Sequence, residues 1–160
     1  MRSIYLEGFC ALFLLVAAAS LGTAAVVINE VEFNPPGDGE KWVELYNNGQ
    51  ENVSIGGWAV VIMEGPWQGT IPLPEGCVLA PAGYYVAPCV PTWTMDYNGT
   101  VILLDSSGAE VDRTHRLSDE DATSFTNSRY PNGVDTNRTG DFAFIMGSKG
   151  RSNGGEPRSG

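Results

Sequence analysis

Residues 26–58, VVINEVEFNPPGDGEKWVELYNNGQENVSIGGW, hold two apolar runs, the turn between them and a closing Gly-Gly-Trp. In the first run Val27, Val31 and Phe33 fall on one face and alternate with polar residues. This period of two predicts a half-buried strand. Residues 34–39 then end the strand, because proline donates no hydrogen bond and glycine accepts positive φ. The rest of the chain is predicted to add further strands to this one.

The second run, residues 42–46, repeats the alternation: Val43 and Leu45 are predicted to face inward and Glu44 outward. The two runs are therefore predicted to form a hairpin. Glu30 and Glu44 come to lie on adjacent strands, and we expect both to be ordinary surface carboxylates of a sheet.

Downstream strands follow from the same patterns. Residues 59–63 are apolar on both faces and rich in β-branched side chains, which predicts a central strand of the sandwich. Turn residues predict two more hairpins and an apolar run predicts a last strand: 77–79 with 84–87, 100–105 with 109–114, and then 142–146. Residues 64–77 are predicted to hold one short strand around Thr70 and Ile71, with Trp67 exposed at a loop tip. Residues 115–140 are predicted to be loops.

Short motifs follow one another along the chain after residue 26: Ile28-Asn29-Glu30-Val31, Trp42-Val43-Glu44-Leu45-Tyr46-Asn47, Ile55-Gly56-Gly57-Trp58, Leu79-Ala80-Pro81-Ala82-Gly83-Tyr84, Val101-Ile102-Leu103-Leu104-Asp105 and Gly108-Ala109-Glu110-Val111-Asp112. In kind and order they resemble the motifs of lamin-tail domains, which occur in nuclear lamins and in secreted bacterial and archaeal proteins. The resemblance implies an all-β fold, an immunoglobulin-like β-sandwich of the lamin-tail type. It departs near the end, where Gly147-Ser148-Lys149-Gly150 and Asn153 stand in place of the expected Thr-Pro-Gly and Asn.

Within these motifs five residues are expected to be motif or core positions: Glu30, Trp42, Glu44, Gly57 and Trp58. Trp58 is expected to anchor the core, because Gly56 and Gly57 before it permit a close approach between strands.

The N-terminus looks like a secretory signal peptide. An apolar run begins at Phe9 and ends in Thr23-Ala24-Ala25, which predicts cleavage after Ala25 or Ala24. An uncleaved anchor is the alternative, and it is the one predicted route to a membrane. We expect residues 1–25 to be a signal peptide, 26–146 one domain and 147–160 a flexible tail, in a protein that is secreted, extracellular or at the cell surface.

The chain is acidic, with a formal net charge of −10. Residues 26–146 hold 5 basic and 17 acidic side chains, so the domain is predicted to repel polyanions. Lamin tails are associated with chromatin as a family, but DNA binding needs basic residues that neutralise phosphates. We expect no nucleic-acid partner.

The sequence lacks the parts of common catalytic sites. It has one histidine, His115, and neither a Gly-x-Ser-x-Gly nor a His-Glu-x-x-His motif. His115 lies between Arg113 and Arg116 and is expected on the surface. Glu30 with Glu44 is the obvious carboxylate pair for hydrolysis, but the resemblance assigns Glu44 to a motif of a domain that is not generally catalytic. We predict that the protein is not an enzyme and needs no cofactor.

Calcium is the one metal that the sequence suggests. Residues 135–140 place oxygen ligands as the start of an EF-hand loop does, but Met146 occupies the twelfth position and no helices flank the loop. A single calcium loop would use Asp135, Asn137, Thr139 and Asp141, with Asp119 as a further candidate. The alternative is a turn rich in Asp and Asn that needs no metal.

Two cysteines remain after the predicted cleavage, Cys77 and Cys89. In an exported protein an even number favours one disulfide, and two buried free thiols are the alternative.

Trp67, Tyr84, Trp93 and Tyr97 lie in or beside loops rich in proline and glycine, and such loops gather at the ends of a sandwich. They are the candidate ligand contacts. The predicted function is an exported, non-catalytic interaction module that binds a protein or a cell-envelope polymer through its loops or an open sheet edge. A small carbohydrate-binding module is the alternative, and a hydrolase or nuclease is a third hypothesis.

Overall fold

A computed structural model describes residues 25–88, 93 and 97–154. Within these ranges the chain is built from strands and one short 3-10 turn, η1 (Thr139–Asp141), as the predicted all-β fold requires. The strands are β1 (Val26–Glu32), β2 (Trp42–Asn47), β3 (Val53–Ser54), β4 (Ala59–Glu64), β5 (Trp67–Pro72), β6 (Val78–Leu79), β7 (Tyr84–Pro88), β8 (Asn98–Leu104), β9 (Glu110–Arg113), β10 (Leu117–Ser118), β11 (Phe125–Arg129) and β12 (Phe142–Met146).

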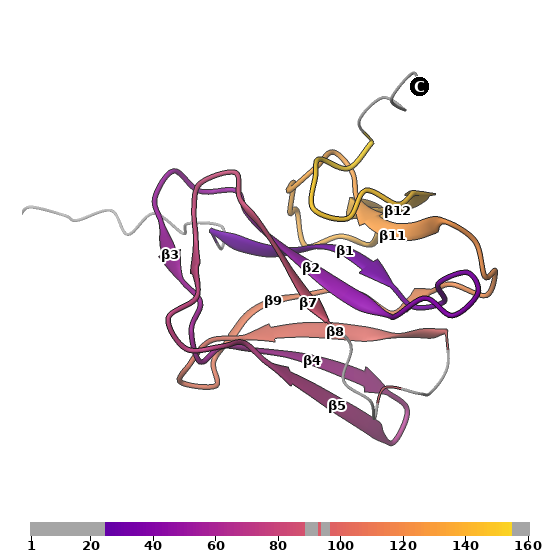
Figure 1. Cartoon of the computed structure of the whole chain (residues 1–160), viewed down its shortest axis with the longest axis horizontal. Coiled ribbons are helices and arrows are strands. Elements are labelled where there is room, and N and C mark those ends of the chain that lie inside the picture. Colours follow the sequence, from indigo (N-terminus) through magenta and orange to yellow (C-terminus); the bar gives the residue numbers. More distant parts are fainter. Residues whose placement is uncertain (1–24, 89–92, 94–96, 155–160) are drawn as a thin grey trace, which may run out of the picture.

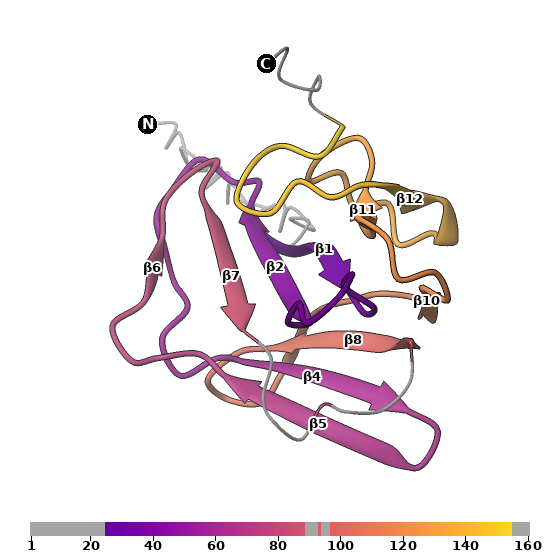
Figure 2. The same cartoon turned by 45° about the vertical axis from the view of Figure 1, so that its right-hand side comes forward.

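The strands form two main antiparallel sheets that pack as a sandwich. The first sheet has the order β12-β11-β1-β2-β7, and the second has the order β10-β8-β4-β5 with β9 paired to β8. A third, two-stranded sheet joins β3 to β6. In Figure 1 β1, β2 and β7 lie above β8, β4 and β5, and Figure 2 shows the same two layers after a rotation. The core lies between them and includes Leu45, Ile62 and Leu103.

The first hairpin is confirmed, but its first strand is not half-buried. β1 pairs with β2, and every residue of β1 is buried. A β-bulge between Ile28 and Glu30 shifts the register, and one extra residue reverses the alternation. The core therefore receives Ile28 and then Val31, while the predicted Val27 is buried outside the core cluster.

Three other sequence predictions are confirmed. β4 lies between β8 and β5 and its three central residues are buried, as predicted for a central strand. β8 and β9 form the predicted hairpin, and β12 covers residues 142–146 as predicted. β4, β8 and β12 were recognisable because each is rich in apolar residues, and β9 because the turn Ser106-Ser107-Gly108 separates it from β8.

The predicted hairpin between residues 77–79 and 84–87 is wrong. β6 pairs with β3, whereas β7 pairs with β2 in the first sheet. The turn between them carries the chain from one sheet to the other instead of reversing it within one. Asn47 holds this turn in place: its backbone carbonyl accepts a hydrogen bond from Ala82 N, and its side chain donates one to Leu79 O.

Two loop predictions also need correction. Residues 115–140 contain β10 and β11, and β11 is a central part of the first sheet. It was hidden because its buried residues are polar: Thr126, Asn127, Ser128 and Arg129. Trp67 does not lie at an exposed tip, since it begins β5 and packs half-buried against the core.

Gly57 and Trp58 form part of a turn that links β3 to β4. Gly57 has a φ of 74°, which favours glycine, and a Cβ on Gly56 would lie 2.7 Å from Gly76 N. The predicted close approach is therefore present. Trp58 packs against the core but is half-buried, so it is a cover of the core and not the fully buried anchor that we expected.

Candidate functional site

Glu30 and Glu44 are fully buried, so their assignment as surface carboxylates is wrong. They are direct partners in the pairing of β1 with β2, on the outer side of the sheet. Glu30 Oε1 accepts hydrogen bonds from Thr126 Oγ1 at 2.6 Å and from Ser148 N at 2.7 Å. Glu44 accepts from Asn29 Nδ2 at 3.0 Å and from Gly150 N at 2.5 Å. The segment that follows β12 supplies a large part of the donors.

This pair is held by hydrogen bonds alone. None of the ion pairs found within the described ranges involves Glu30 or Glu44. Burial raises the pKa of Glu44 to about 7, although the hydrogen bonds from Asn29 and Gly150 oppose the rise. A buried carboxylate without a cation is expected to behave in this way.

Residues 147–154, which we name the C-terminal strap, are part of the folded domain. Ser148 and Asn153 are buried. Asn153 Nδ2 donates to Asn29 O and to Arg129 O, both at 2.9 Å. The prediction of a flexible tail from residue 147 is therefore wrong for the strap. It failed because the strap has no apolar residues and is held by polar contacts. Residues 155–160 lie outside the described part of the chain.

The outer face of the sheet holds a further motif residue. Trp42 is buried, and Lys149 Nζ of the strap lies 5.2 Å from the centre of its ring. This distance is that of a cation–π contact. Among the five motif positions, Glu30, Trp42 and Glu44 are thus covered by the strap, while Gly57 and Trp58 lie elsewhere.

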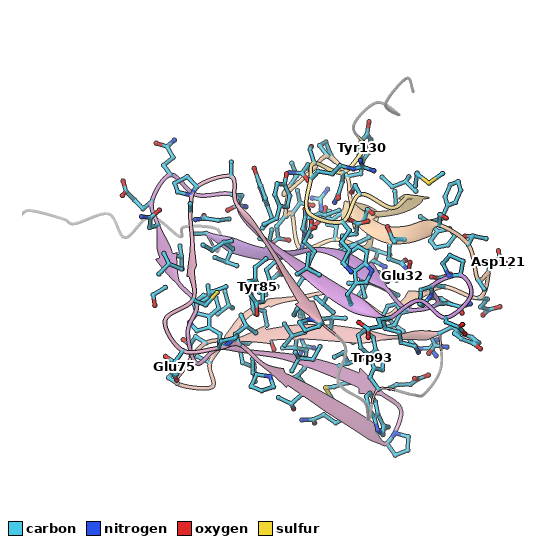
Figure 3. All side chains as sticks on the ribbon, viewed as in Figure 1. Glu32, Glu75, Tyr85, Trp93, Asp121 and Tyr130 are labelled. Carbon is cyan, nitrogen blue, oxygen red and sulfur yellow. The ribbon has the colours of Figure 1, made fainter. Side chains whose placement is uncertain are left out.

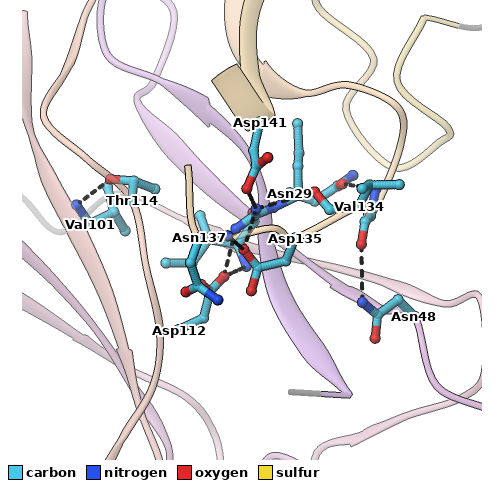
Figure 4. A network of polar contacts seen from close by, with 12 residues as sticks. Asn29, Asn48, Val101, Asp112, Thr114, Val134, Asp135, Asn137 and Asp141 are labelled. Atoms are coloured by element: carbon cyan, nitrogen blue, oxygen red, sulfur yellow. Dashed lines mark hydrogen bonds and ion pairs between the residues drawn. The ribbon is translucent and has the colours of Figure 1, made fainter. Parts of the chain in front are cut away.

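Arg129 forms a second buried cluster, shown from close by in Figure 4. Its guanidinium lies 3.0 Å from Asp112 Oδ2, 3.0 Å from Asp135 Oδ1 and 3.4 Å from Asp141 Oδ2. Arg129 Nε also donates to Ile28 O at 2.9 Å, and Ile28 N donates to Asp112 Oδ2 at 2.7 Å. The Arg129 and Asp112 side chains thus supply hydrogen-bond partners for the backbone N–H and carbonyl of Ile28, next to the bulge in β1.

Two of the residues predicted to bind calcium, Asp135 and Asp141, belong to this cluster. Asp135 and Asp141 both face the Arg129 guanidinium, so a positive charge already lies where the metal was expected. Asn137 donates its backbone N–H to Asp135 Oδ1 at 3.0 Å. Thr139 begins η1 and is exposed. Within residues 25–88, 93 and 97–154 no group of three or more His, Cys, Asp or Glu side chains is arranged to hold a metal ion. The geometry fits the alternative of a turn rich in Asp and Asn.

The pKa of Asp141 is set mainly by burial and by hydrogen bonds, with a smaller contribution from Arg129. Burial alone would raise it, but hydrogen bonds from the hydroxyl and the backbone N–H of Thr136 and the charge of Arg129 bring the pKa below its ordinary value. Asp141 is therefore held ionised, in contrast to Glu44.

A pocket of about 370 Å³ opens beside this cluster and is lined by His115, Arg113, Arg138 and Phe142, among others. Burial lowers the pKa of His115, whose ring lies 5.9 Å from that of Phe142. Arg113 is paired with Glu110 at 2.8 Å. His115 makes no hydrogen bond to a described residue, so this part of the chain shows no base aligned with a nucleophile.

Glu32 and Asp119 form a third buried acidic site, which the sequence did not reveal. Both carboxylate oxygens of Asp119 are buried without a hydrogen-bond partner. Burial raises the pKa of Glu32 to about 7, against the opposing hydrogen bond from Asn34 N at 2.9 Å, and the charge of Asp119 adds to the rise. A glutamate that ends a strand and an aspartate in a distant loop carry no sequence signal of contact.

The four aromatic candidates do not form one binding platform. Trp93 is 3% exposed and packs edge-on against Phe33 in the core; Figure 3 labels it. Tyr84 lies on β7, where it contacts Tyr46 and accepts a hydrogen bond from Asn132. Trp67 is half-buried against the core, which leaves Tyr97 exposed near Lys41.

Cys77 is a free, half-buried thiol that packs against the core. Cys89 lies outside the described residues, so the disulfide stays a prediction. The described residues contain no helix that is long and apolar enough to cross a membrane.

An exposed apolar patch lies at the β12 end of the first sheet. β12 is an edge strand, and no described strand pairs with its outer side. Phe125, Phe144 and Met146 are 40%, 42% and 57% exposed. The rings of Phe125 and Phe144 lie 5.8 Å apart. We call these three residues and the free side of β12 the open edge.

The register shows why the patch is apolar. Phe144 is paired with Asn127, which is itself paired with the core residue Val31, so Phe144 faces the core side of its sheet. Asn127 Nδ2 reaches Ser118 O of the second sheet at 3.0 Å. Beyond this contact the second sheet does not extend, and Figures 1 and 2 show β12 away from β4 and β5. The open edge thus lies on the core side of its sheet, where its three apolar side chains remain 40% to 57% exposed.

Comparison with known proteins agrees with this architecture. No curated protein matches the chain at a significant level. A family model described as Lamin Tail Domain matches residues 19–118. That match spans more than half of the chain and is consistent with the antiparallel sandwich. The chain therefore belongs to the lamin-tail domain family, whose immunoglobulin-like members are interaction and structural domains not known as enzymes.

Proposed function

We propose that this protein is an exported, non-catalytic interaction module that binds a protein or a cell-envelope polymer through its open edge. The observation that carries the proposal is the exposure of Phe125, Phe144 and Met146 beside an unpaired strand. Exposed backbone groups of an edge strand add a partner strand, and the apolar side chains beside them supply affinity.

Two other edge strands of the main sheets, β7 and β5, support this choice. β7 ends in Pro88 and β5 ends in Pro72, and proline blocks the addition of a strand. β12 has the sequence FAFIM, with no proline, glycine or charge. Natural proteins usually protect such an edge unless it serves an interaction.

The alternatives receive less support. A carbohydrate-binding module would need the loop aromatics to share one face, and Trp93 and Trp67 pack against the core instead. An enzyme would need an acid and a base in one accessible site, whereas Glu30 and Glu44 are covered by the strap.

A comparison of two matched variants tests the binding surface. Phe144→Lys places a charge on the open edge, and Val78→Lys places one on an exposed apolar residue of β6. We expect wild type and Val78→Lys to retain a partner from a detergent-solubilised envelope fraction and Phe144→Lys to lose it by at least about tenfold. Equal retention by all three proteins would contradict the proposal, provided that circular dichroism shows them folded.

Export rests on the apolar segment before residue 26, which lies mostly outside the described residues. The intact mass of protein recovered from the medium or cell surface should correspond to a chain that starts at Val26 or Ala25. A mass that retains Met1 would contradict cleavage.

Nucleic acid is not among the proposed partners. The domain has 5 basic residues among 17 acidic ones between residues 26 and 146, and Arg129 and Arg113 are paired with acids. Titration of the mature protein with labelled duplex should show no binding at micromolar concentration in about 0.15 M salt. Micromolar affinity that persists at this salt concentration would contradict the prediction.

A further inference from the structure

We infer that the open edge pairs with the open edge of a second copy of this chain, with the two β12 strands antiparallel about a twofold axis at Phe144. The inference rests on the proposed function, because it uses the same surface and names the partner. It makes the protein a homotypic module whose first sheet continues from one copy into the other.

The strand is suited to pairing with itself. A twofold axis at Phe144, perpendicular to the sheet, places Phe144 opposite Phe144, Phe142 opposite Met146, and Ala143 opposite Ile145 of the second copy. No pair contains a charge or a proline, so neither repulsion nor a missing donor interrupts the ladder. Since each copy has one β12, the pairing closes as a dimer and does not continue as a fibre.

The apolar side chains gain a cover in this arrangement. An axis perpendicular to the sheet keeps the core side of both copies on the same side, so Phe144 of each copy meets Phe144 of the other. Phe125 and Met146 flank this contact, because they are partners across β11 and β12. The two exposed patches join into one apolar strip along the centre of the combined sheet.

Charges at the two ends of the strand favour the antiparallel arrangement. Arg138 is exposed and lies just before η1 and β12. The exposed acidic residues Glu120 and Asp121 lie in the turn before β11, beside the opposite end of β12; Figure 3 labels Asp121 at this side of the molecule. Antiparallel pairing brings the Arg138 end of each copy to the acidic turn of the other.

The overall charge opposes association. Each chain carries a formal charge of −10, so two copies repel each other at long range. The interface is also short, which predicts a dissociation constant on the order of 0.1 mM. Added salt should therefore strengthen the dimer by screening the repulsion, in contrast to contacts with a basic partner, which salt weakens.

Sedimentation velocity of the mature protein tests the association, from about 5 μM to about 1 mM and at about 0.05 and 0.5 M salt. We expect the average mass to rise towards twice the monomer mass with concentration, and to do so at lower concentration in high salt. Val78→Lys should behave as wild type, and Phe144→Lys should dimerise at least about tenfold more weakly.

Cysteine crosslinking tests the register. In a background with Cys77→Ala and Cys89→Ala, Phe144→Cys places two thiols opposite each other across the axis, at a separation that a disulfide spans. Ile145→Cys is a matched control, because its opposite residue is Ala143 and not itself. We expect an oxidised dimer for Phe144→Cys at several times the yield of Ile145→Cys or Val78→Cys.

The outcomes separate the two proposals. A wild-type protein that remains monomeric at about 1 mM in both salts, or equal crosslinking of the three cysteine variants, would overturn the homodimer. If Phe144→Lys then still loses an envelope partner, the proposed function stands with another protein at the open edge. If neither assay depends on Phe144, both proposals fail.

Discussion

Two buried acidic clusters that both contact β1 differ in how they offset the burial of their carboxylates. Asp112, Asp135 and Asp141 meet the guanidinium of Arg129. Glu30 and Glu44 meet no cation and are held by hydroxyl, amide and backbone donors. The difference lies in the groups that offset the cost of burial: a cation in one cluster, and hydrogen-bond donors alone in the other.

The consequence appears in the pKa values. The pKa of Asp141 is lowered, despite burial, by its hydrogen bonds and by Arg129. The pKa of Glu44 is raised to about 7 by burial. Asp141 and Glu44 should therefore respond to pH in opposite ways, while burial raises the pKa of Asp112 as it does that of Glu44. Four measurements test the contrast between the clusters.

Removal of the cation should have the largest effect. Arg129→Met leaves three buried aspartates without a positive partner, and we expect the free energy of unfolding to fall by about 3 to 5 kcal/mol. Arg113→Met removes the exposed pair with Glu110 and should cost less than about 1 kcal/mol. Denaturant unfolding measures both. Similar losses for the two variants would show that Arg129 is not the centre of its cluster.

Removal of the strap should break the other cluster. A chain that ends at Met146 lacks the donors of Ser148, Gly150 and Asn153, and hydrogen bonds to charged groups contribute roughly 1.5 to 3 kcal/mol each. In the truncated chain, water would replace some of these hydrogen bonds. We therefore expect the free energy of unfolding to fall by about 3 kcal/mol, measured by thermal or denaturant unfolding. A chain that ends at Gly154 serves as the control and should match the full mature protein. If both truncations match it, the strap does not stabilise the pair.

The pH dependence should separate Asp141 from Glu44 by sign. A folded-state pKa of about 7 for Glu44 lies above its ordinary value of 4.5, so its contribution is complete below about pH 4.5 and is lost as pH rises through 7. Glu32 acts in the same direction. Asp141 has a lowered pKa, so its contribution is lost as pH falls.

We therefore expect stability to be greatest near pH 5 and to decline by about 2 to 3 kcal/mol towards pH 8. Glu44→Gln should flatten the decline at high pH and leave the acid limb unchanged, with Glu120→Gln as an exposed control. A wild-type curve that rises between pH 5 and 8 would show that Glu44 and Glu32 are ionised throughout.

Removal of a single hydroxyl group should have the smallest effect on stability. Ser148→Ala keeps the backbone donor to Glu30 and removes Ser148 Oγ, which lies 2.9 Å from Glu30 Oε2 and 2.6 Å from Asn153 Oδ1. We expect a loss of about 1 to 2 kcal/mol. Ser107→Ala removes an exposed hydroxyl contact with Asp105 and should change stability by less than about 0.5 kcal/mol. A loss at Ser148 no larger than that at Ser107 would make the hydroxyl unimportant.

Most elements that could be predicted from sequence have an apolar pattern. β2, β4, β8 and β12 each place apolar residues between turn residues, and all appear near the predicted positions. β9 has one apolar residue, Val111, and was predicted from the turn before it. β11 was missed because Thr126 and Ser128 face the buried glutamates rather than a hydrophobic core. The strap was missed for the same reason, since its burial depends on acceptors that lie more than 100 residues away in sequence.

The amino-acid sequence by itself determined the family, the all-β class and the course of most strands, because alternation and turn chemistry act between near neighbours. Only the tertiary structure decided which carboxylates are buried, which of them meet a cation, and which sheet edge remains open. Those outcomes depend on contacts between distant segments, such as Glu30 with Ser148 or Arg129 with Ile28. A charge shows in the sequence, whereas its solvation is set by what the fold places around it.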